Sequence, residues 1–107
     1  MPDVYSRLLF AGSLPTNLLT SLFVVPTGAT YVVRDMSVLL PSSSELFNIQ
    51  VGPPGSTTVV WYWTARSTPD WQHWEGRLTV PTGMNLWGYA SGADAQLTVS
   101  GYHLGAG

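Results

Sequence analysis

The chain of 107 residues contains no cysteine and no lysine. Without cysteine it can form neither a disulfide framework nor a thiolate metal site. Only 9% of its residues are charged and the net charge is −2, whereas an average globular protein is about 25% charged. Because phosphate binding needs clustered positive charge, four scattered arginines argue against nucleic acid as a partner.

Long apolar runs are also missing. No stretch approaches the roughly 18 apolar residues of a membrane span. The first residues, Met-Pro-Asp-Val, have neither the basic nor the apolar region of a signal peptide. We therefore expect no membrane partner, and synthesis in a bacterial host cytoplasm without export by the signal-peptide route.

The residue pattern is typical of β-strands along the whole chain. No segment shows a sustained helical apolar period with caps, so we expect minimal helix. Runs of alternating, β-branched and aromatic residues are instead separated by turn residues, at the spacing of a sandwich or barrel. These runs predict strands at residues 4–10, 18–25, 30–40, 45–51, 57–64, 71–80, 84–89 and 95–104.

About eight antiparallel strands in two sheets is the count of a jelly roll. The sequence therefore predicts an all-β, antiparallel, jelly-roll-like β-sandwich, formed as one domain over 1–107, with 1–12 as an extended N-terminal strand or arm. In the longest run, 30–40, strict alternation places five residues on one face. These residues are Val32, Arg34, Met36, Val38 and Leu40.

One four-residue phrase, Val-Pro-Thr-Gly, occurs twice, at 25–28 and at 80–83. Proline favours the second position of a β-turn and glycine the fourth, so each phrase predicts a tight reversal between strands. The residues that we expect to form these structural turns are Pro26, Gly28, Pro81 and Gly83.

Several segments together resemble a known group of proteins. They are Val-Tyr-Ser-Arg-Leu-Leu at 4–9, the two Val-Pro-Thr-Gly turns, Trp-Glu-Gly-Arg-Leu at 74–78 and Ser-Gly-Tyr-His-Leu at 100–104. This combination resembles small β-sandwich, jelly-roll virion proteins of tailed bacteriophages. The resemblance implies a capsid decoration (cement) protein or a small tail or fibre component, commonly a homotrimer.

The aromatic residues suggest what this protein contacts. Five tryptophans are too many for the core of so small a sandwich. On a strand, Trp61 and Trp63 point one way and Tyr62 the other, so one aromatic face lies outside the core unless a partner covers it. Aromatic and arginine side chains dominate binding energy at protein interfaces. We expect interface contacts from Trp61, Trp63, Arg66, Trp71 and Trp74.

Catalytic and metal-binding chemistry is weakly represented. No serine lies in a nucleophile-elbow context, and the histidines are His73 and His103. Asp70 and Glu75 flank two tryptophans, and a glycosidase needs two carboxylates facing a sugar. Asp70 is better explained as shaping the turn after Pro69. His73 and Glu75 share a strand face, yet nothing indicates a third metal ligand. We expect no enzyme activity, no cofactor and no metal.

The functional expectation follows from the resemblance and the aromatic surface. It is a non-enzymatic structural protein of a tailed-phage virion, most simply a capsid decoration protein. Its partners would be further copies of itself, as a homotrimer, and the major capsid protein or other virion proteins. The alternative is a minor tail or fibre module that binds host-surface glycan through exposed tryptophans.

Overall fold

The structure, a computed structural model, describes residues 7–42, 44–67, 69–92 and 94–105. It contains eight strands and confirms the predicted all-β antiparallel sandwich. The strands are β1 (Arg7–Leu14), β2 (Thr20–Val24), β3 (Ala29–Leu40), β4 (Leu46–Gly52), β5 (Thr58–Thr64), β6 (Asp70–Val80), β7 (Asn85–Ala90) and β8 (Ala95–Gly105).

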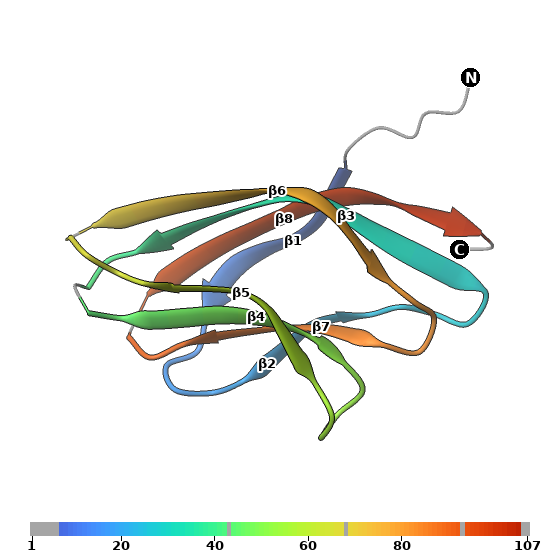
Figure 1. Cartoon of the computed structure of the whole chain (residues 1–107), viewed down its shortest axis with the longest axis horizontal. Coiled ribbons are helices and arrows are strands. Elements are labelled where there is room, and N and C mark those ends of the chain that lie inside the picture. Colours follow the sequence, from blue (N-terminus) through green and yellow to red (C-terminus); the bar gives the residue numbers. More distant parts are fainter. Residues whose placement is uncertain (1–6, 43, 68, 93, 106–107) are drawn as a thin grey trace.

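The strands divide into two four-stranded sheets that face each other (Figure 1). One sheet has the order β1-β8-β3-β6 and the other the order β2-β7-β4-β5. Every connection except the β4–β5 hairpin therefore crosses from one sheet to the other. All pairings between the named strands are antiparallel. This interleaving of eight strands is jelly-roll-like, as predicted.

Strand boundaries lie close to those predicted, with one shift at the N-terminal side. The strand predicted at 4–10 continues instead to Leu14, because Gly12 and Ser13 pair with Leu97 and Gln96 of β8. Of the predicted N-terminal strand or arm, residues 7–12 belong to β1, and residues 1–6 lie outside the described residues.

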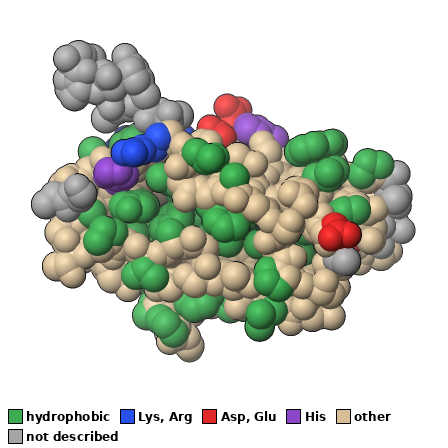
Figure 2. All heavy atoms as spheres, turned by 180° about the vertical axis from the view of Figure 1, so that it is seen from behind, with side chains coloured by type: hydrophobic (Ala, Val, Ile, Leu, Met, Phe, Trp, Pro, Cys, Tyr) green, Lys and Arg blue, Asp and Glu red, His purple; other side chains and the backbone are tan. Residues whose placement is uncertain are grey.

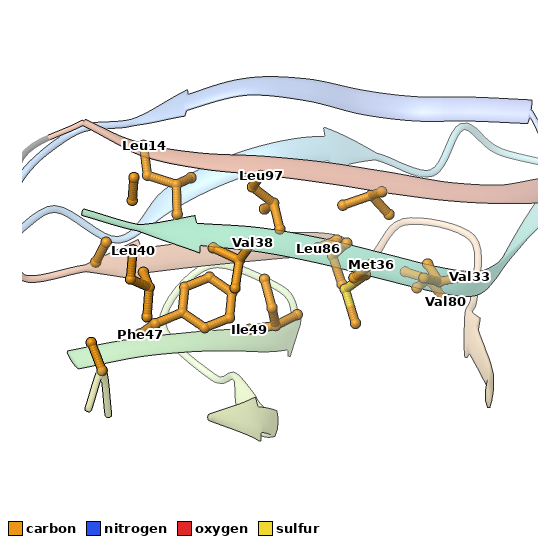
Figure 3. Close-up of a cluster of buried hydrophobic side chains, with 14 of the residues drawn as sticks. Leu14, Val33, Met36, Val38, Leu40, Phe47, Ile49, Val80, Leu86 and Leu97 are labelled. Carbon is orange, nitrogen blue, oxygen red and sulfur yellow. The ribbon is translucent and has the colours of Figure 1, made fainter. Parts of the chain in front are cut away.

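The core lies between the sheets and is built from side chains at alternate positions of facing strands (Figure 3). Met36 and Val38 of β3 meet Phe47 and Ile49 of β4 there, and all four are at most 1% exposed. Burying a side chain of this size contributes about 1.5–3 kcal/mol relative to leaving it in water. Because side chains alternate along a strand, the residues next to these buried ones point outward.

The alternation predicted for 30–40 holds from Met36 to Leu40 but fails at Arg34, where a β-bulge breaks it. The register of β3 shifts between Val33 and Asp35 against both β6 and β8. Val33 therefore joins Met36 in the core, and Arg34 is turned out to solvent. A bulge inserts one residue and reverses the phase of the side chains beyond it. Strict alternation would instead have buried an unpaired guanidinium, which is costly.

The two Val-Pro-Thr-Gly segments form the β2–β3 and β6–β7 connections, at the same end of the sandwich (Figure 1). In each, the residue after glycine donates its backbone N–H to the proline carbonyl, at 3.1 Å. Proline is thus first in the turn and glycine third, one position earlier than the predicted assignment. The third position of a type II turn needs a positive φ, and Gly28 and Gly83 have φ of 89° and 79°.

The two turns are also bonded to each other. Val25 donates its N–H to the carbonyl of Met84, and Gly83 donates its N–H to the carbonyl of Val25, both at 2.9 Å. The Thr82 hydroxyl donates to the carbonyl of Pro26, also at 2.9 Å. The repeated phrase therefore builds one joint that ties the two sheets together.

Substituting Gly83 should test the backbone requirement of this joint. A Cβ at Gly83 meets no atom within 4 Å, so Gly83→Ala adds backbone strain without a clash. We expect a loss of about 1 kcal/mol in the free energy of unfolding, measured by urea titration of tryptophan fluorescence. Gly83→Asn should lose less, because asparagine tolerates the left-handed region. Equal losses in the two variants would contradict this explanation.

A second glycine is required for a steric reason. An ideal Cβ at Gly101 would lie 1.9 Å from the carbonyl oxygen of Val32. We expect Gly101→Ala to cost at least about 2 kcal/mol, because the backbone of β3 must move away. Gly12→Ala is the matched control, since its Cβ makes an ordinary 3.4 Å contact with Phe10. Its unfolding free energy should change by about 0.5 kcal/mol or less.

Candidate interaction surface

Charge is confined to one of the two sheets. Strands β2, β7, β4 and β5 contain no Asp, Glu, Lys or Arg. Every charged strand residue belongs to the other sheet: Arg7, Arg34, Asp35, Asp70, Glu75 and Arg77. In Figure 2, most charged and histidine side chains lie along the upper part of the molecule, one acidic group lies at mid-height on the right, and the lower edge shows hydrophobic side chains among tan atoms.

The outer face of the uncharged sheet carries aromatic and amide side chains in cross-strand rows. Asn48 of β4 lies between Tyr62 of β5 and Tyr89 of β7. Gln50, two residues further along, lies between Val59 and Trp87. These side chains point outward because their neighbours in sequence, such as Phe47 and Ile49, are buried. Tyr62 is 74% exposed.

The polar groups of this face already bond one another. Gln50 donates from Nε2 to Oδ1 of Asn48 at 2.9 Å. The Trp87 indole donates to the carbonyl of Gly52, and the Tyr89 hydroxyl donates to Oδ1 of Asn17, both at 2.9 Å. Such internal bonds lower the cost of covering the face with an apolar or protein surface, because fewer polar groups are stripped of water unpaired.

The aromatic residues predicted to make contacts are placed unequally. Trp61 and Trp63 are half-buried and pack on the core, where Trp61 meets Phe47 edge-on at 5.1 Å between ring centroids. Trp74 also points inward. Trp71 is 64% exposed on β6. Arg66 is exposed, with its guanidinium 5.2 Å from the ring centroid of Trp63.

Three exposed apolar residues of β5 were not among the predicted contacts: Val59, Val60 and Tyr62. The pattern did indicate that Tyr62 and the two tryptophans point in opposite directions. It could not tell which direction was the core, because both faces of the strand carry aromatic rings. The packing of Trp61 against Phe47 shows that the tryptophan face of β5 is the one directed to the core.

Asp70 organises the loop between β5 and β6. Its Oδ2 accepts bonds from the Trp63 indole at 3.0 Å and the Arg66 backbone N–H at 2.9 Å. Its Oδ1 accepts a bond from the Gln72 amide at 2.9 Å. These donors, the Trp63 indole first, stabilise the charged form and lower the pKa of Asp70 below its usual value. The carboxylate is therefore committed to shaping the loop.

This arrangement predicts an acid-dependent loss of stability. Because the pKa of Asp70 is lower when folded, its stabilisation is full above its unfolded pKa, about 4, and falls as pH drops below that value. Wild type should be more stable than Asp70→Asn at pH 7, and the gap in unfolding free energy should narrow as the pH falls below about 4. Urea titrations across this range measure the gap. A constant gap would contradict the linkage.

The structure brings one serine and one histidine together. The Ser37 hydroxyl and His73 Nδ1 are 2.9 Å apart, although 36 residues separate them in sequence. They lie mid-strand, on β3 and β6, where no turn presents a nucleophile. Ser37 lies between His73 and Thr98, since β3 pairs with strands on both sides. The backbone N–H groups of β3 at Ser37 are used in the sheet ladder on both sides, so they are not free to form an oxyanion hole.

The histidines considered as metal ligands lie apart. His73 pairs with Ser37, and His103 pairs with Tyr31, six residues away along β3, which is roughly 20 Å of strand. His103 stacks on Tyr31 and is 2.7 Å from the Arg7 guanidinium. Among the residues described by the structure, no three His, Asp or Glu side chains group as metal ligands would.

Comparison with known proteins identifies a similar fold. No family model and no curated protein sequence matches the chain. Two crystal structures of a pentameric capsid protein isolated from metagenomic phage sequences superpose with a TM-score of 0.55 and 14% identity. The superposition covers 95% of this chain, but only 64% and 63% of the two capsid chains. At this identity the likeness concerns the fold.

The described residues also contain no helix of the length and apolarity needed to cross a bilayer.

Proposed function

We propose that this chain is a non-enzymatic structural protein of a tailed-phage virion, acting as a capsid decoration (cement) protein. The observation that carries the proposal is the uncharged sheet, which exposes aromatic and aliphatic side chains over strands without a formal charge. Contiguous apolar surface of this kind on a small protein marks an interface. Repeating such a contact over a symmetric shell multiplies its effect on shell stability.

The capsid protein of similar fold supports a location in the virion. It is a pentamer from phage sequences, and the segments named in the sequence analysis resemble phage virion proteins. The partners that we propose are further copies of the chain and the major capsid protein or other virion proteins. No catalytic step is required of Ser37 and His73, which lie on the opposite, charged sheet.

The number of copies is part of the proposal. The sequence resemblance favours a homotrimer, whereas the proteins of similar fold are pentamers. Both are closed rings built from a repeated heterologous contact. The uncharged face suits either ring, because it brings no like charges together between neighbours.

A tail or fibre module that binds glycan is the second candidate. Tyr62, exposed beside Asn48, gives an aromatic ring next to an amide, the combination that sugars stack on and bond to. The observation against it is that the amides of Asn48 and Gln50 already bond each other. A sugar would have to displace those bonds, while a protein surface would not.

A charge placed at the centre of the face should disrupt self-association. Asn48→Asp keeps the Oδ1 acceptor for Gln50 and adds one negative charge. We expect at least a tenfold rise in the dissociation constant, about 1.4 kcal/mol, by sedimentation equilibrium. Gln96→Glu, an equivalent change at an exposed position of β8 in the other sheet, should leave the dissociation constant nearly unchanged. A wild-type chain that is monomeric at micromolar concentration would contradict the proposal.

The virion role has its own test. Particles of the phage whose genome encodes the chain should contain it in a fixed ratio to the shell protein, by quantitative mass spectrometry. Its absence from particles would overturn the proposal. A saturable change in tryptophan fluorescence on titration with cell-wall sugars, without binding to capsids, would favour the glycan module instead.

A further inference from the structure

Strand β5 is an edge of the uncharged sheet and lacks the features that usually block pairing with another chain. It pairs with β4 on one side, and no other described strand lies beside it. Exposed edges normally carry charges, proline or other features that block pairing with another chain. Thr58–Thr64 has neither charge nor proline, and the uncharged stretch extends over 46–65. By contrast, β6, the edge of the other sheet on this side, carries Glu75 and Arg77.

Apolar groups are exposed on both faces of β5. Val59 is 48% exposed, Val60 36% and Tyr62 74%. A register shift between Ile49 and Gln50 of β4 leaves Val60 as the bulged residue of β5. The regular ladder on the outer edge is therefore confined to positions 61–64.

An apolar groove of about 540 Å³ adjoins this edge, where the sandwich is open between β5 and β6. Thr58 and Val60 line one wall, and Leu78, Pro81 and Met84 line the other. No described strand pairs with either β5 or β6 across this opening. An unpaired backbone edge and an apolar groove thus lie side by side.

We propose that a second copy of this chain covers this side of the sandwich, its β5 running antiparallel to β5 across a two-fold axis. The β2-β7-β4-β5 sheets of the two copies then join through their β5 strands into one continuous sheet. This contact deepens the self-association in the proposed function and rests on it. Because an isologous contact closes on itself, within a shell it would link two neighbouring rings.

The occupant is a second copy for two reasons. A two-fold contact places residues near the axis opposite their own mates, so any formal charge there would face an identical charge. Positions 58–64 carry no formal charge, so no like charges meet at the axis. Antiparallel edges also offer N–H groups and carbonyls in self-complementary alternation.

The geometry limits the register. Residues opposite each other in an antiparallel pair share a face, so some residue of β5 must lie opposite its own symmetry mate. Within 61–64 that residue is at position 62 or 63. We take position 62, because Tyr62 is 74% exposed whereas Trp63 packs on the core. Position 61 then lies opposite position 63 of the second copy. Tyr62 then lies on the axis.

The absence of cysteine makes this register testable by disulfide trapping. Opposed residues in an antiparallel pair have Cα atoms about 4.5–5.5 Å apart, within disulfide reach. Tyr62→Cys should therefore give a covalent dimer on mild oxidation, as the main band of a non-reducing gel. Thr64→Cys should not, because its own mate would lie roughly 13 Å away along the strands. Leu8→Cys, on exposed β1 at the opposite edge, is the second control.

A second pair of variants needs no thiol. Tyr62→Lys places like charges on the axis and should weaken the dimer at least tenfold in sedimentation equilibrium, whereas Leu8→Lys, 61% exposed in wild type, should not. Circular dichroism establishes that each variant is folded. The β5 contact is overturned if cysteine at position 64 or 8 gives as much disulfide-linked dimer as cysteine at position 62. It is also overturned if Tyr62→Lys leaves the dissociation constant unchanged.

These outcomes separate the contact from the proposed function. A wild-type oligomer that is sensitive to Asn48→Asp but not to Tyr62→Lys contradicts the β5 contact and leaves the virion role standing. A chain that assembles through β5 but is missing from virions contradicts the virion role and leaves the contact standing. Binding of an unrelated peptide at β5 in place of a second copy would overturn the choice of occupant.

Discussion

The hydrogen bonds between the two proline-glycine turns are the constraint on which the rest of the sandwich depends. Each turn carries the chain from one sheet to the other, and Val25 both donates to Met84 and accepts from Gly83. A sandwich held only by apolar contact could slide, because burial is non-directional. Two turns locked at one end fix the position of β3 against β7, and with it the layers of side chains that meet in the core.

Once that joint is set, the scarcity of charge shapes the surface. The sheet with order β1-β8-β3-β6 carries all the charged strand residues. The other sheet has only neutral groups, several bonded to one another, as Gln50 is to Asn48. The protein thus has one face suited to water and one suited to contact, although both sheets share the same core.

Much of this fold could be predicted from sequence, because alternation and turn residues are local signals. Strand ends fell within a few residues of those observed, since Gly, Pro and Ser mark them. The bulge at Arg34 was missed, although the adjacent charges of Arg34 and Asp35 interrupt the alternation of residue types there. Only pairing with β6 and β8 shows that an extra residue is inserted. The direction of Trp61 likewise depends on Phe47, a neighbour on another strand.

The same limit applies to the candidate surface. Sequence indicated that an aromatic face needs a partner, but it favoured the large rings, and Trp61, Trp63 and Trp74 turn out to support the core. Their packing is still relevant to contact, because it holds β5 against the core while the smaller Val59 and Val60 lie exposed. A rigid strand loses little entropy on pairing, since its backbone is already ordered.

An uncharged edge strand can form a specific contact, but it can also promote aggregation. A segment such as Thr58–Thr64, apolar and free of proline, can template open-ended association if nothing stops it. A two-fold contact limits this association, because pairing β5 with β5 uses up that edge of the sheet. The remaining edge is β2, which has five residues. Short edge strands are themselves poor templates. Closure by symmetry, with a short strand at the far edge, explains how a sheet without charges can associate and still remain finite.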